Sequence, residues 1–250
     1  MDAIILAAGI GKRLGSHAEN KSKCLLTFDG ISLLQRHLSI LIHYNISKII
    51  VVTGYQSDQV RIEIENSEAA KITTTIDNPD FDQGSLISML IGLEKLTSNE
   101  NFLLMDADVL YDHNLIYRLI NSEINDCFML DKDFVAGDEP VKICIRDGKI
   151  VEFRKIINKN LTFDFQGESV GFFRFTFETA LELKRHAWTY LENNKNDTPY
   201  EEVIRDLLLE NPDKFGFEDI TGLKWIEIDF PEDIERANTE ILSAISQVYM

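Results

Sequence analysis

The residue types best suited to chemistry lie near the start of the chain. Residues 3–8 are all apolar, glycines follow at positions 9 and 11, and Arg13 and Lys23 bring positive charge. Because glycine lacks a Cβ atom, backbone N–H groups at Gly9 and Gly11 can close around an anion. An ordinary strand-to-helix turn is the alternative, but cations gathered around two glycines repel one another unless an anion lies among them. The pattern therefore predicts a buried strand that leads into a phosphate-binding loop.

Two familiar glycine loops do not fit this spacing. Gly9, Gly11 and Gly15 are spaced one residue too widely for the dinucleotide-binding fingerprint. A P-loop needs Gly-Lys-Ser or Gly-Lys-Thr four residues after its first glycine, and none follows here. The loop therefore belongs to neither class.

Carboxylates stand at the ends of two further predicted strands. Residues 101–110 predict a strand that ends in Asp106 and Asp108, and Asp229 follows a short strand predicted at 225–228. Since successive strand residues point to opposite faces, positions i and i+2 share a face and can reach one cation. Mg²⁺ prefers oxygen ligands and bridges carboxylates to phosphates, so we expect Asp108 and Asp229 to bind it. Asp229 could instead cap the helix that follows.

A polar, turn-rich segment at residues 77–85 is expected near the same place. It follows a predicted strand, and parallel sheets bind ligands beyond the carboxyl ends of their strands. We therefore interpret Gln83, Gly84, Ser85 and Ser88 as contacts to a nucleotide base. The alternative for Ser85 is that it only caps the next helix.

Polar residues in the second half are candidates for a pocket that binds a second substrate. Lys142 and Lys155 are cations in predicted strands, and residues 167–171, with Glu168 and Gly171, form a compact polar break. Simple solvation of the strand faces is the alternative for each cation.

Composition narrows the class of protein. The 250 residues, 44% hydrophobic and 27% charged, suffice for one large globular domain. With 42 acidic and 25 basic residues the formal charge is -17, which disfavours binding to nucleic acid or to an anionic membrane surface. No apolar run approaches the roughly 20 residues of a membrane span. Three cysteines without metal-ligand spacing are typical of reduced thiols, so a cytoplasmic location is expected.

Alternating strands and helices predict a parallel sheet covered on both faces. Besides residues 3–8 and 101–110, strands are predicted at 47–53 and 71–76. Helices are predicted at 31–44, 57–66 with Ser57 as N-cap, 86–96, and 114–120. From residue 126 the pattern changes to short strands at 127–130, 141–146, 149–154 and 162–175, which indicates antiparallel or mixed sheet. Two helices follow, at 177–193 and 199–209, the second with Thr198 as N-cap.

In this order, the motifs resemble those of the nucleotidyltransferase superfamily across nearly the whole chain. The resemblance rests on Leu6-Ala-Ala-Gly-x-Gly-x-Arg13, Lys23, the strand-end Asp108, and Trp225-Ile-Glu-Ile-Asp229. The closing motif and the short length are similar to bacterial phosphocholine cytidylyltransferases and to relatives that act on aminoethylphosphonate. The resemblance implies an α/β, three-layer Rossmann-like fold, with a mixed, mostly parallel central sheet and a small antiparallel extension on the acceptor side.

The same resemblance implies an activity and a division of the chain. A Mg²⁺-dependent enzyme would transfer CMP from CTP to a small phosphorylated or phosphonate acceptor, such as phosphocholine or aminoethylphosphonate, and release pyrophosphate. One domain, 1–250, would comprise a nucleotide-binding half at 1–125, an acceptor-binding half at 126–222, and residues 223–250 with a metal-binding Asp and a C-terminal helix. A homodimer is possible.

Roles for individual residues are also implied by the resemblance. Arg13 and Lys23 would bind the triphosphate and act in catalysis, and Asp108 and Asp229 would hold Mg²⁺. The other nucleotide contacts would be Leu6, Ala7, Ala8, Gly9, Gly11, Gln83, Gly84, Ser85, Ser88 and Asp106. The acceptor contacts would be Lys142, Lys155, Glu168, Gly171, Tyr200, Glu201, Trp225 and Glu227. For Glu201, a favourable interaction with a helix dipole is the alternative.

Two departures from the family pattern leave alternatives open. Ser22 stands where the family usually has proline, and Gln83-Gly84 stands where phosphocholine enzymes tend to have asparagine. The second departure also suits uracil or thymine, so a hexose-1-phosphate uridylyl- or thymidylyltransferase is the first alternative, beside a molybdopterin-type nucleotidyltransferase. A non-catalytic nucleotide-binding subunit of the same fold is another. A glycosyltransferase is disfavoured because it has no use for the glycine loop with Arg13.

Overall fold

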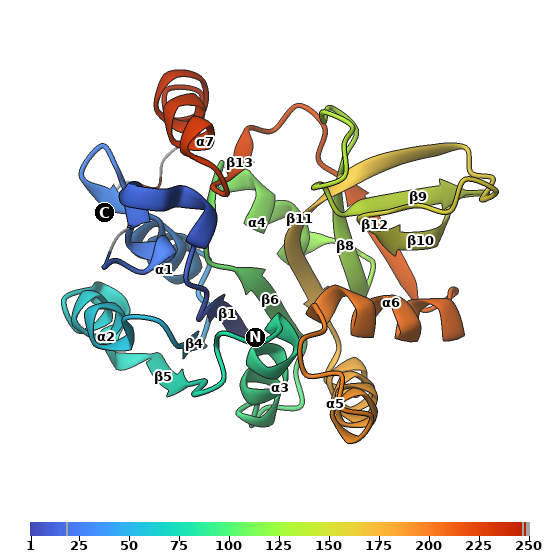
Figure 1. Ribbon diagram of the computed structural model, residues 1–250, viewed down its shortest axis with the longest axis horizontal. Coiled ribbons are helices and arrows are strands. Elements are labelled where there is room, and N and C mark those ends of the chain that lie inside the picture. The colour runs from blue at the N-terminus through green and yellow to red at the C-terminus, as the bar shows by residue number, and fades with distance from the viewer. Residues whose placement is uncertain (19, 247, 249–250) are drawn as a thin grey trace.

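The computed structural model describes residues 1–18, 20–246 and 248, and a mixed sheet of nine strands lies at its centre (Figure 1). The first part of this sheet consists of parallel strands. In spatial order they are β6 (Phe102–Asp106), β1 (Asp2–Ala7), β4 (Lys48–Thr53) and β5 (Thr73–Asp77). Because they run in one direction, the residues that follow each strand meet at one edge of the sheet.

Helices cover both faces of the central sheet. One face packs against α1 (Leu33–His43), α2 (Ser57–Glu65) and α4 (Asn114–Asn121). The other packs against α3 (Ser85–Glu94), α5 (Phe177–Glu192) and α6 (Tyr200–Glu210). Residues along β1 alternate between the two layers: Ile5 belongs to the first cluster and Ile4 to the second, and both are fully buried. Each such side chain contributes about 1.5–3 kcal/mol to folding.

The second part of the sheet is mainly antiparallel and is joined to the first by the long strand β11 (Phe165–Phe175). This strand pairs with β6 on one side and also with β8 (Asp126–Asp131) and β9 (Lys142–Arg146), all in antiparallel orientation. β10 (Lys149–Arg154) continues from β9 through the Asp147-Gly148 turn, whose φ values of 52° and 73° fit the hairpin predicted there. β12 (Phe215–Asp219) pairs in parallel with β8.

Shorter elements close the fold around the strand ends. β7 (Val109–Tyr111) pairs with β13 (Trp225–Glu227), which brings the end of the chain beside the residues that follow β6. α7 (Pro231–Arg236) and a π-helical turn (Ala237–Ile241) follow. The remaining elements are β2 (Thr27–Phe28), β3 (Ile31–Ser32) and 3₁₀ helices at Lys12–Ala18, Lys23–Leu25 and Glu68–Lys71.

The predicted fold class is confirmed, because a parallel central sheet lies between two helix layers and carries an antiparallel extension. Two predicted helix caps are wrong. Gln56, with φ of 55°, is the N-cap of α2, and Ser57 is its first residue. Pro199 is the N-cap of α6, while Thr198 instead accepts the Leu86 N–H at 3.2 Å. Among the described residues, none of the helices has the length and apolar character needed to cross a membrane.

Candidate active site

A cavity of about 220 Å³ lies at the carboxyl ends of β1 and β6. The glycine loop, the segment before α3 and the end of β6 form its walls, so the structure brings the two predicted nucleotide-binding segments together. The predicted residues that line it are Leu6, Ala7, Ala8, Gly9, Lys23, Gln83, Gly84, Ser85, Ser88 and Asp106. The predicted metal ligand Asp108 and Ser22, the departure from the family pattern, also line it. Cys24, Phe81 and Ala107 line it as well and were not singled out by the sequence.

The glycine loop leaves room beside its backbone. Gly11 has a φ of 68°, which glycine adopts without strain. A Cβ atom added to Gly9 would meet nothing within 4 Å, so packing does not require glycine there. The open space beside Gly9 is instead available to an approaching anion.

The start of α3 is fixed by the segment before α6. Leu86 N donates to Thr198 O at 3.2 Å, and a Cβ atom on Gly84 would lie 2.3 Å from the same oxygen. Gly84 is the N-cap of α3, so Ser85 does not cap the helix. The Ser85 hydroxyl accepts a hydrogen bond from Tyr200 N at 3.0 Å. The predicted base-reading segment is therefore held in place by the acceptor half of the chain.

The polar side chains of this segment differ in their availability. Ser88 is buried, and its hydroxyl accepts a hydrogen bond from Asn78 Nδ2 at 3.0 Å. Gln83 is exposed, and its amide donates to Asp80 Oδ1 at 3.2 Å. Gln83 is thus the more open of the two to a ligand.

Three carboxylates converge beside the cavity. Asp108, Glu227 and Asp229 each offer an oxygen atom within 4.8 Å of the others. The pairing of β13 with β7 and a hydrogen bond from Ile228 N to Asp108 O at 3.0 Å bring their segments together. The sequence predicts Asp108 and Asp229 as metal ligands but assigns Glu227 to the acceptor. Glu227 stands two residues before Asp229, and this spacing could have indicated that both belong to the carboxylate cluster.

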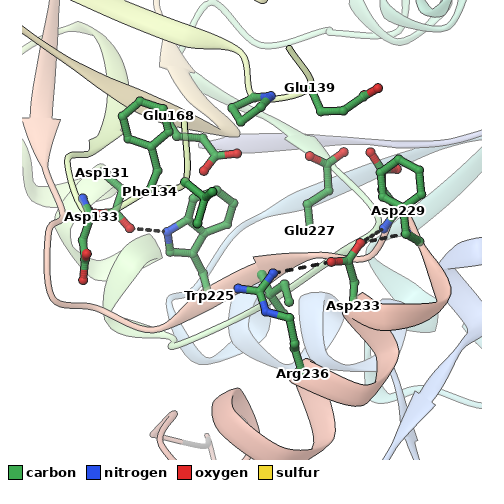
Figure 2. Close-up of a pocket in the computed structure, with 14 residues that line it drawn as sticks. Asp131, Asp133, Phe134, Glu139, Glu168, Trp225, Glu227, Asp229, Asp233 and Arg236 are labelled. Atoms are coloured by element: carbon green, nitrogen blue, oxygen red, sulfur yellow. Dashed lines mark hydrogen bonds and ion pairs between the residues drawn. The ribbon is translucent and has the colours of Figure 1, made fainter. Parts of the chain in front are cut away.

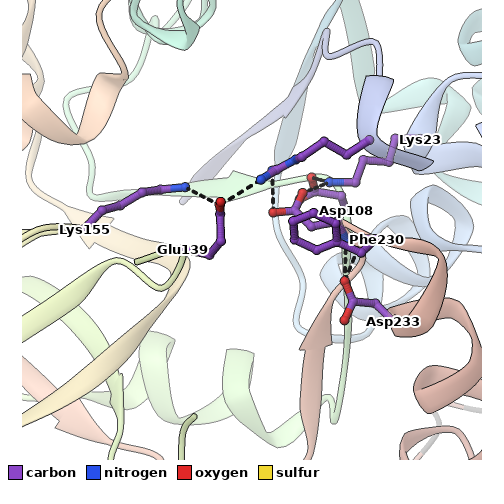
Figure 3. A network of polar contacts seen from close by, with 8 residues as sticks. Lys23, Asp108, Glu139, Lys155, Phe230 and Asp233 are labelled. Atoms are coloured by element: carbon purple, nitrogen blue, oxygen red, sulfur yellow. Dashed lines mark hydrogen bonds and ion pairs between the residues drawn. The ribbon is translucent and has the colours of Figure 1, made fainter. Parts of the chain in front are cut away.

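Lys23 lies between two of these carboxylates (Figure 3). Its Nζ atom donates to Asp108 Oδ2 and to Asp229 Oδ1, each at 2.5 Å. Burial alone would lower the pKa of Lys23, but attraction by Asp108 and Asp229 outweighs it and raises that pKa. Burial alone would raise the pKa of Asp229, but Lys23 and Arg13 hold it below its usual range. The ammonium group of Lys23 therefore already neutralises negative charge between Asp108 and Asp229.

Glu227 has no such partner among the described residues. Desolvation by the surrounding walls of the cleft raises the pKa of Glu227 to about 8, with further contributions from Asp108 and Asp229. A divalent cation would relieve this repulsion, and carboxylate oxygens are the ligands that Mg²⁺ prefers. The residues present therefore fit a hard divalent cation.

Asp106 stands apart from the three-carboxylate cluster. Its Oδ2 atom accepts a hydrogen bond from Tyr200 Oη at 2.7 Å, and burial raises its pKa well above the usual range. A Cβ atom on Gly171 would lie 2.2 Å from the same oxygen. Tyr200 is only 3% exposed, so the prediction that it contacts the acceptor is corrected: it supports Asp106 from within the core. Gly171 likewise makes room for Asp106.

A second cavity, of about 270 Å³, adjoins the cluster on its other side (Figure 2). Seven carboxylates line it, against one guanidinium, that of Arg236. The indole N–H of Trp225 donates to Asp131 Oδ2 at 2.8 Å. Burial raises the pKa of Glu168 to about 7, with a contribution from Asp131. The carboxylates are Asp131, Asp133, Glu139, Glu168, Glu227, Asp229 and Asp233, and aromatic walls come from Phe134, Trp225 and Phe230.

The sequence predicts only part of this acid cavity. Glu168, Trp225 and Glu227 were assigned to the acceptor, and all three line it. Asp229, which follows β13, was predicted as a metal ligand. The remaining carboxylates lie where no local motif marks them: at the end of β8 (Asp131), between β8 and β9 (Asp133, Glu139) and on α7 (Asp233). A run of acidic residues interrupted by Phe134 was the available signal.

Neither predicted acceptor cation lines the acid cavity, although Lys155 Nζ lies 3.5 Å from Glu139 Oε2 in its wall. Lys142 is 7% exposed and donates to Pro140 O at 3.1 Å and to Lys155 O at 2.5 Å. Its ammonium group therefore links the segment before β9 to the residue that follows β10. Lys155 and Glu201 line a third cavity, of about 420 Å³, beside α6. The Oε2 atom of Glu201 is buried and has no hydrogen-bond partner in the described part of the chain. The structure therefore does not gather all predicted acceptor residues in one place.

Comparison with known proteins gives the family. Residues 3–148 match the family described as MobA-like NTP transferase domain. The chain is 23% identical to the CTP:phosphoglutamine cytidylyltransferase of Campylobacter jejuni, over 94% of this chain and 98% of that protein. It is 26% identical to the bifunctional IPC transferase and DIPP synthase of Archaeoglobus fulgidus, over 98% of this chain and 44% of that protein.

A solved structure has a similar fold. The CTP:phosphocholine cytidylyltransferase of Streptococcus pneumoniae superposes with a TM-score of 0.74 at 20% identity, over 95% of this chain and 97% of that one. Its likeness bears on the fold, whereas the match over residues 3–148 covers more than half of the sequence and establishes kinship. The chain belongs to the MobA-like NTP transferase family and is a nucleotidyltransferase, as its motifs predict.

Proposed function

We propose that this nucleotidyltransferase transfers CMP from CTP to a small acceptor that carries a phosphate or phosphonate and an ammonium group. The observation behind this proposal is that two cavities of opposite character meet at Asp108 and Asp229. One combines glycine backbone with the cation Lys23, and the other is lined by carboxylates and aromatic rings. Phosphocholine and aminoethylphosphonate are acceptors of this kind.

The choice of CTP is supported by the relatives. The Campylobacter jejuni and Streptococcus pneumoniae proteins are both named as CTP enzymes. Gln83, the most open polar side chain of the base-reading segment, would supply an amide for the edge of the base. An amide both donates and accepts hydrogen bonds, so uracil and thymine remain the competing bases.

Asp108 and Asp229 would hold Mg²⁺, with Glu227 close enough to assist. When bound, Mg²⁺ supplies charge neutralisation at the reacting phosphate. Lys23 and Arg13, which neutralise the carboxylates in the free protein, can then turn to the triphosphate and stabilise the departing pyrophosphate.

The transfer itself needs no general base. An acceptor phosphate or phosphonate oxygen is already ionised near neutral pH and attacks the α-phosphorus in line. The bond between the α-phosphorus and its bridging oxygen breaks, and the electron pair leaves with pyrophosphate. The chain then contributes by positioning and by charge, as in other phosphoryl transfers.

The acid cavity supports an acceptor with a positive charge. The Glu168 carboxylate has no hydrogen-bond or ion-pair partner among the described residues, and an unpaired carboxylate in a partly buried wall is costly. An ammonium group would pair with it and could also lie against the face of Trp225, since aromatic faces attract cations. The indole N–H is already satisfied by Asp131, so the Trp225 ring has no polar group left to pair.

Pyrophosphate release tests the proposal. With Mg²⁺ present, CTP, UTP, dTTP, GTP and ATP are each combined with phosphocholine, phosphoethanolamine, aminoethylphosphonate or hexose 1-phosphates. We expect release with CTP and one of the ammonium-bearing acceptors. Release with UTP or dTTP and a hexose 1-phosphate would contradict the proposal and assign the chain to a sugar nucleotidyltransferase. The Asp108→Asn variant serves as the blank.

A further inference from the structure

Glu139 connects the two sides of the cleft through a single carboxylate oxygen (Figure 3). Its Oε2 atom accepts a hydrogen bond from Arg13 Nη1 at 2.8 Å and lies 3.5 Å from Lys155 Nζ. Arg13 belongs to the N-terminal loop, whereas Lys155 directly follows β10 in the acceptor half. One acidic side chain therefore neutralises cations from both halves at once.

Glu139 lies on a segment with few other attachments. We call residues 132–141, which join β8 to β9, the strap. Its ends are held, because Lys132 N donates to Thr221 Oγ1 at 3.0 Å and Val141 O accepts from Ser169 N at 2.8 Å. Between these points, no backbone N–H of residues 134–140 donates a hydrogen bond to another described residue. The ion pairs of Glu139 are thus the main polar contacts of the middle of the strap.

We propose that Glu139 occupies the position of a substrate phosphate oxygen in the free enzyme and is displaced when substrate binds. A guanidinium and an ammonium group around one oxygen atom form the arrangement that proteins use for phosphate. An incoming phosphate would bring more negative charge to the same place and repel the carboxylate. The inference rests on the proposed function, because that function supplies the phosphates.

Displacement of Glu139 has a consequence for the second substrate. Phe134, on the same strap, lines the acid cavity together with Trp225. Release of the strap therefore changes one wall of the acceptor cavity when the triphosphate binds. Binding at one site then alters affinity at the other, and by linkage the effect is reciprocal. The strap couples the two halves of the cleft.

The alternative role for Glu139 predicts the opposite result. If Glu139 merely positioned Arg13 and Lys155 for phosphate, removing its charge would weaken phosphate binding. If it competes with phosphate, removing its charge strengthens binding. Asp138 offers a matched control, since it carries the same charge on the same strap and makes no ion pair with any described residue.

Calorimetric binding of inorganic pyrophosphate separates these roles. We expect Glu139→Gln to lower the Kd about two- to fivefold, or about 0.4–1 kcal/mol, which is the upper part of the range for exposed ion pairs. Asp138→Asn should leave the Kd unchanged. An equal or higher Kd for Glu139→Gln, or the same gain in Asp138→Asn, would overturn the proposal.

Limited proteolysis gives a second readout, in which the comparison between the two variants needs no ligand. Chymotrypsin can cut after Phe134 once the strap is released. We expect faster cleavage there in Glu139→Gln than in Asp138→Asn, and pyrophosphate should accelerate cleavage of the unsubstituted protein. Equal cleavage of the two variants would overturn the proposal. If the unsubstituted protein bound no pyrophosphate, the proposed function would fail, while the comparison of the two variants would still show whether Glu139 holds the strap.

Discussion

The nucleotide cavity and the acid cavity lie on either side of Asp108 and Asp229 but are built from different parts of the chain. The nucleotide cavity is lined largely by small residues at strand ends, with Lys23 as its cation. The acid cavity is lined by acidic and aromatic side chains from the end of β8, β11, β13, α7 and the strap. Binding by backbone groups suits the nucleotide, which is the substrate that a nucleotidyltransferase family shares. Binding by side chains suits the acceptor, because side chains can differ from one enzyme to the next. The difference indicates where acceptor specificity is encoded.

The carboxylates between the two cavities should give the largest effects. We expect Asp108→Asn and Asp229→Asn each to lower turnover about 10²- to 10³-fold, because loss of a metal ligand removes several kcal/mol of transition-state stabilisation. Steady-state pyrophosphate release measures the effect, and circular dichroism checks the fold. Asp213→Asn, which removes an exposed carboxylate paired with Lys149, is the control. Turnover within a few-fold of normal in either site variant would refute that ligand.

Substitution of two glycines tests the contact between β11 and β6, where the two halves of the sheet meet. Gly171 and Gly148 both have positive φ, at 77° and 73°, but only Gly171 would place a Cβ atom against Asp106, at 2.2 Å. We expect Gly148→Ala to lower the free energy of unfolding by about 1 kcal/mol. Gly171→Ala should lower it by a further 1–3 kcal/mol or so, because of overpacking. Urea denaturation measures the free energy of unfolding of both variants. Equal losses would show that Asp106 moves aside from the added methyl group without a cost in stability.

The smallest expected effect concerns pH and the acid cavity. Burial raises the pKa of Glu168 from 4.5 to about 7, so this side chain is neutral below that pH and charged above it. The KM for an ammonium-bearing acceptor should therefore fall about two- to fivefold between pH 6 and pH 8, since only the carboxylate attracts the cation.

The Glu168→Gln variant separates this titration from that of the acceptor. It should raise the acceptor KM at pH 8, leave the KM for CTP unchanged, and flatten the pH dependence to that of the acceptor phosphate itself. An unchanged acceptor KM in this variant would remove Glu168 from the acceptor site.

The same contrast between the cavities explains how much could be predicted from the sequence. The parallel half follows from contiguous patterns: an apolar strand, then glycines or carboxylates at its end. Asp108, after β6, follows this pattern. Asp229 comes after β13, outside the parallel half, and meets Asp108 because β13 pairs with β7.

The acceptor side could be predicted less well because it depends on packing between distant segments. Tyr200 was assigned to the acceptor site, yet its ring packs in the core and its hydroxyl supports Asp106. Lys142 appeared to be a free cation, yet it holds two carbonyl groups. Glu139 is one of several acidic residues in its segment, and its role could not be predicted because it depends on residues from both ends of the cleft.

Crystals grown with CTP and Mn²⁺ in place of Mg²⁺ would test the arrangement of the two cavities most directly. The anomalous signal of Mn²⁺ locates the metal without reference to the protein atoms. We predict one peak between the carboxylates of Asp108 and Asp229, with Lys23 moved away from them and the triphosphate beside Gly9. A peak at another place, or Lys23 still bridging the two carboxylates with CTP bound, would contradict it.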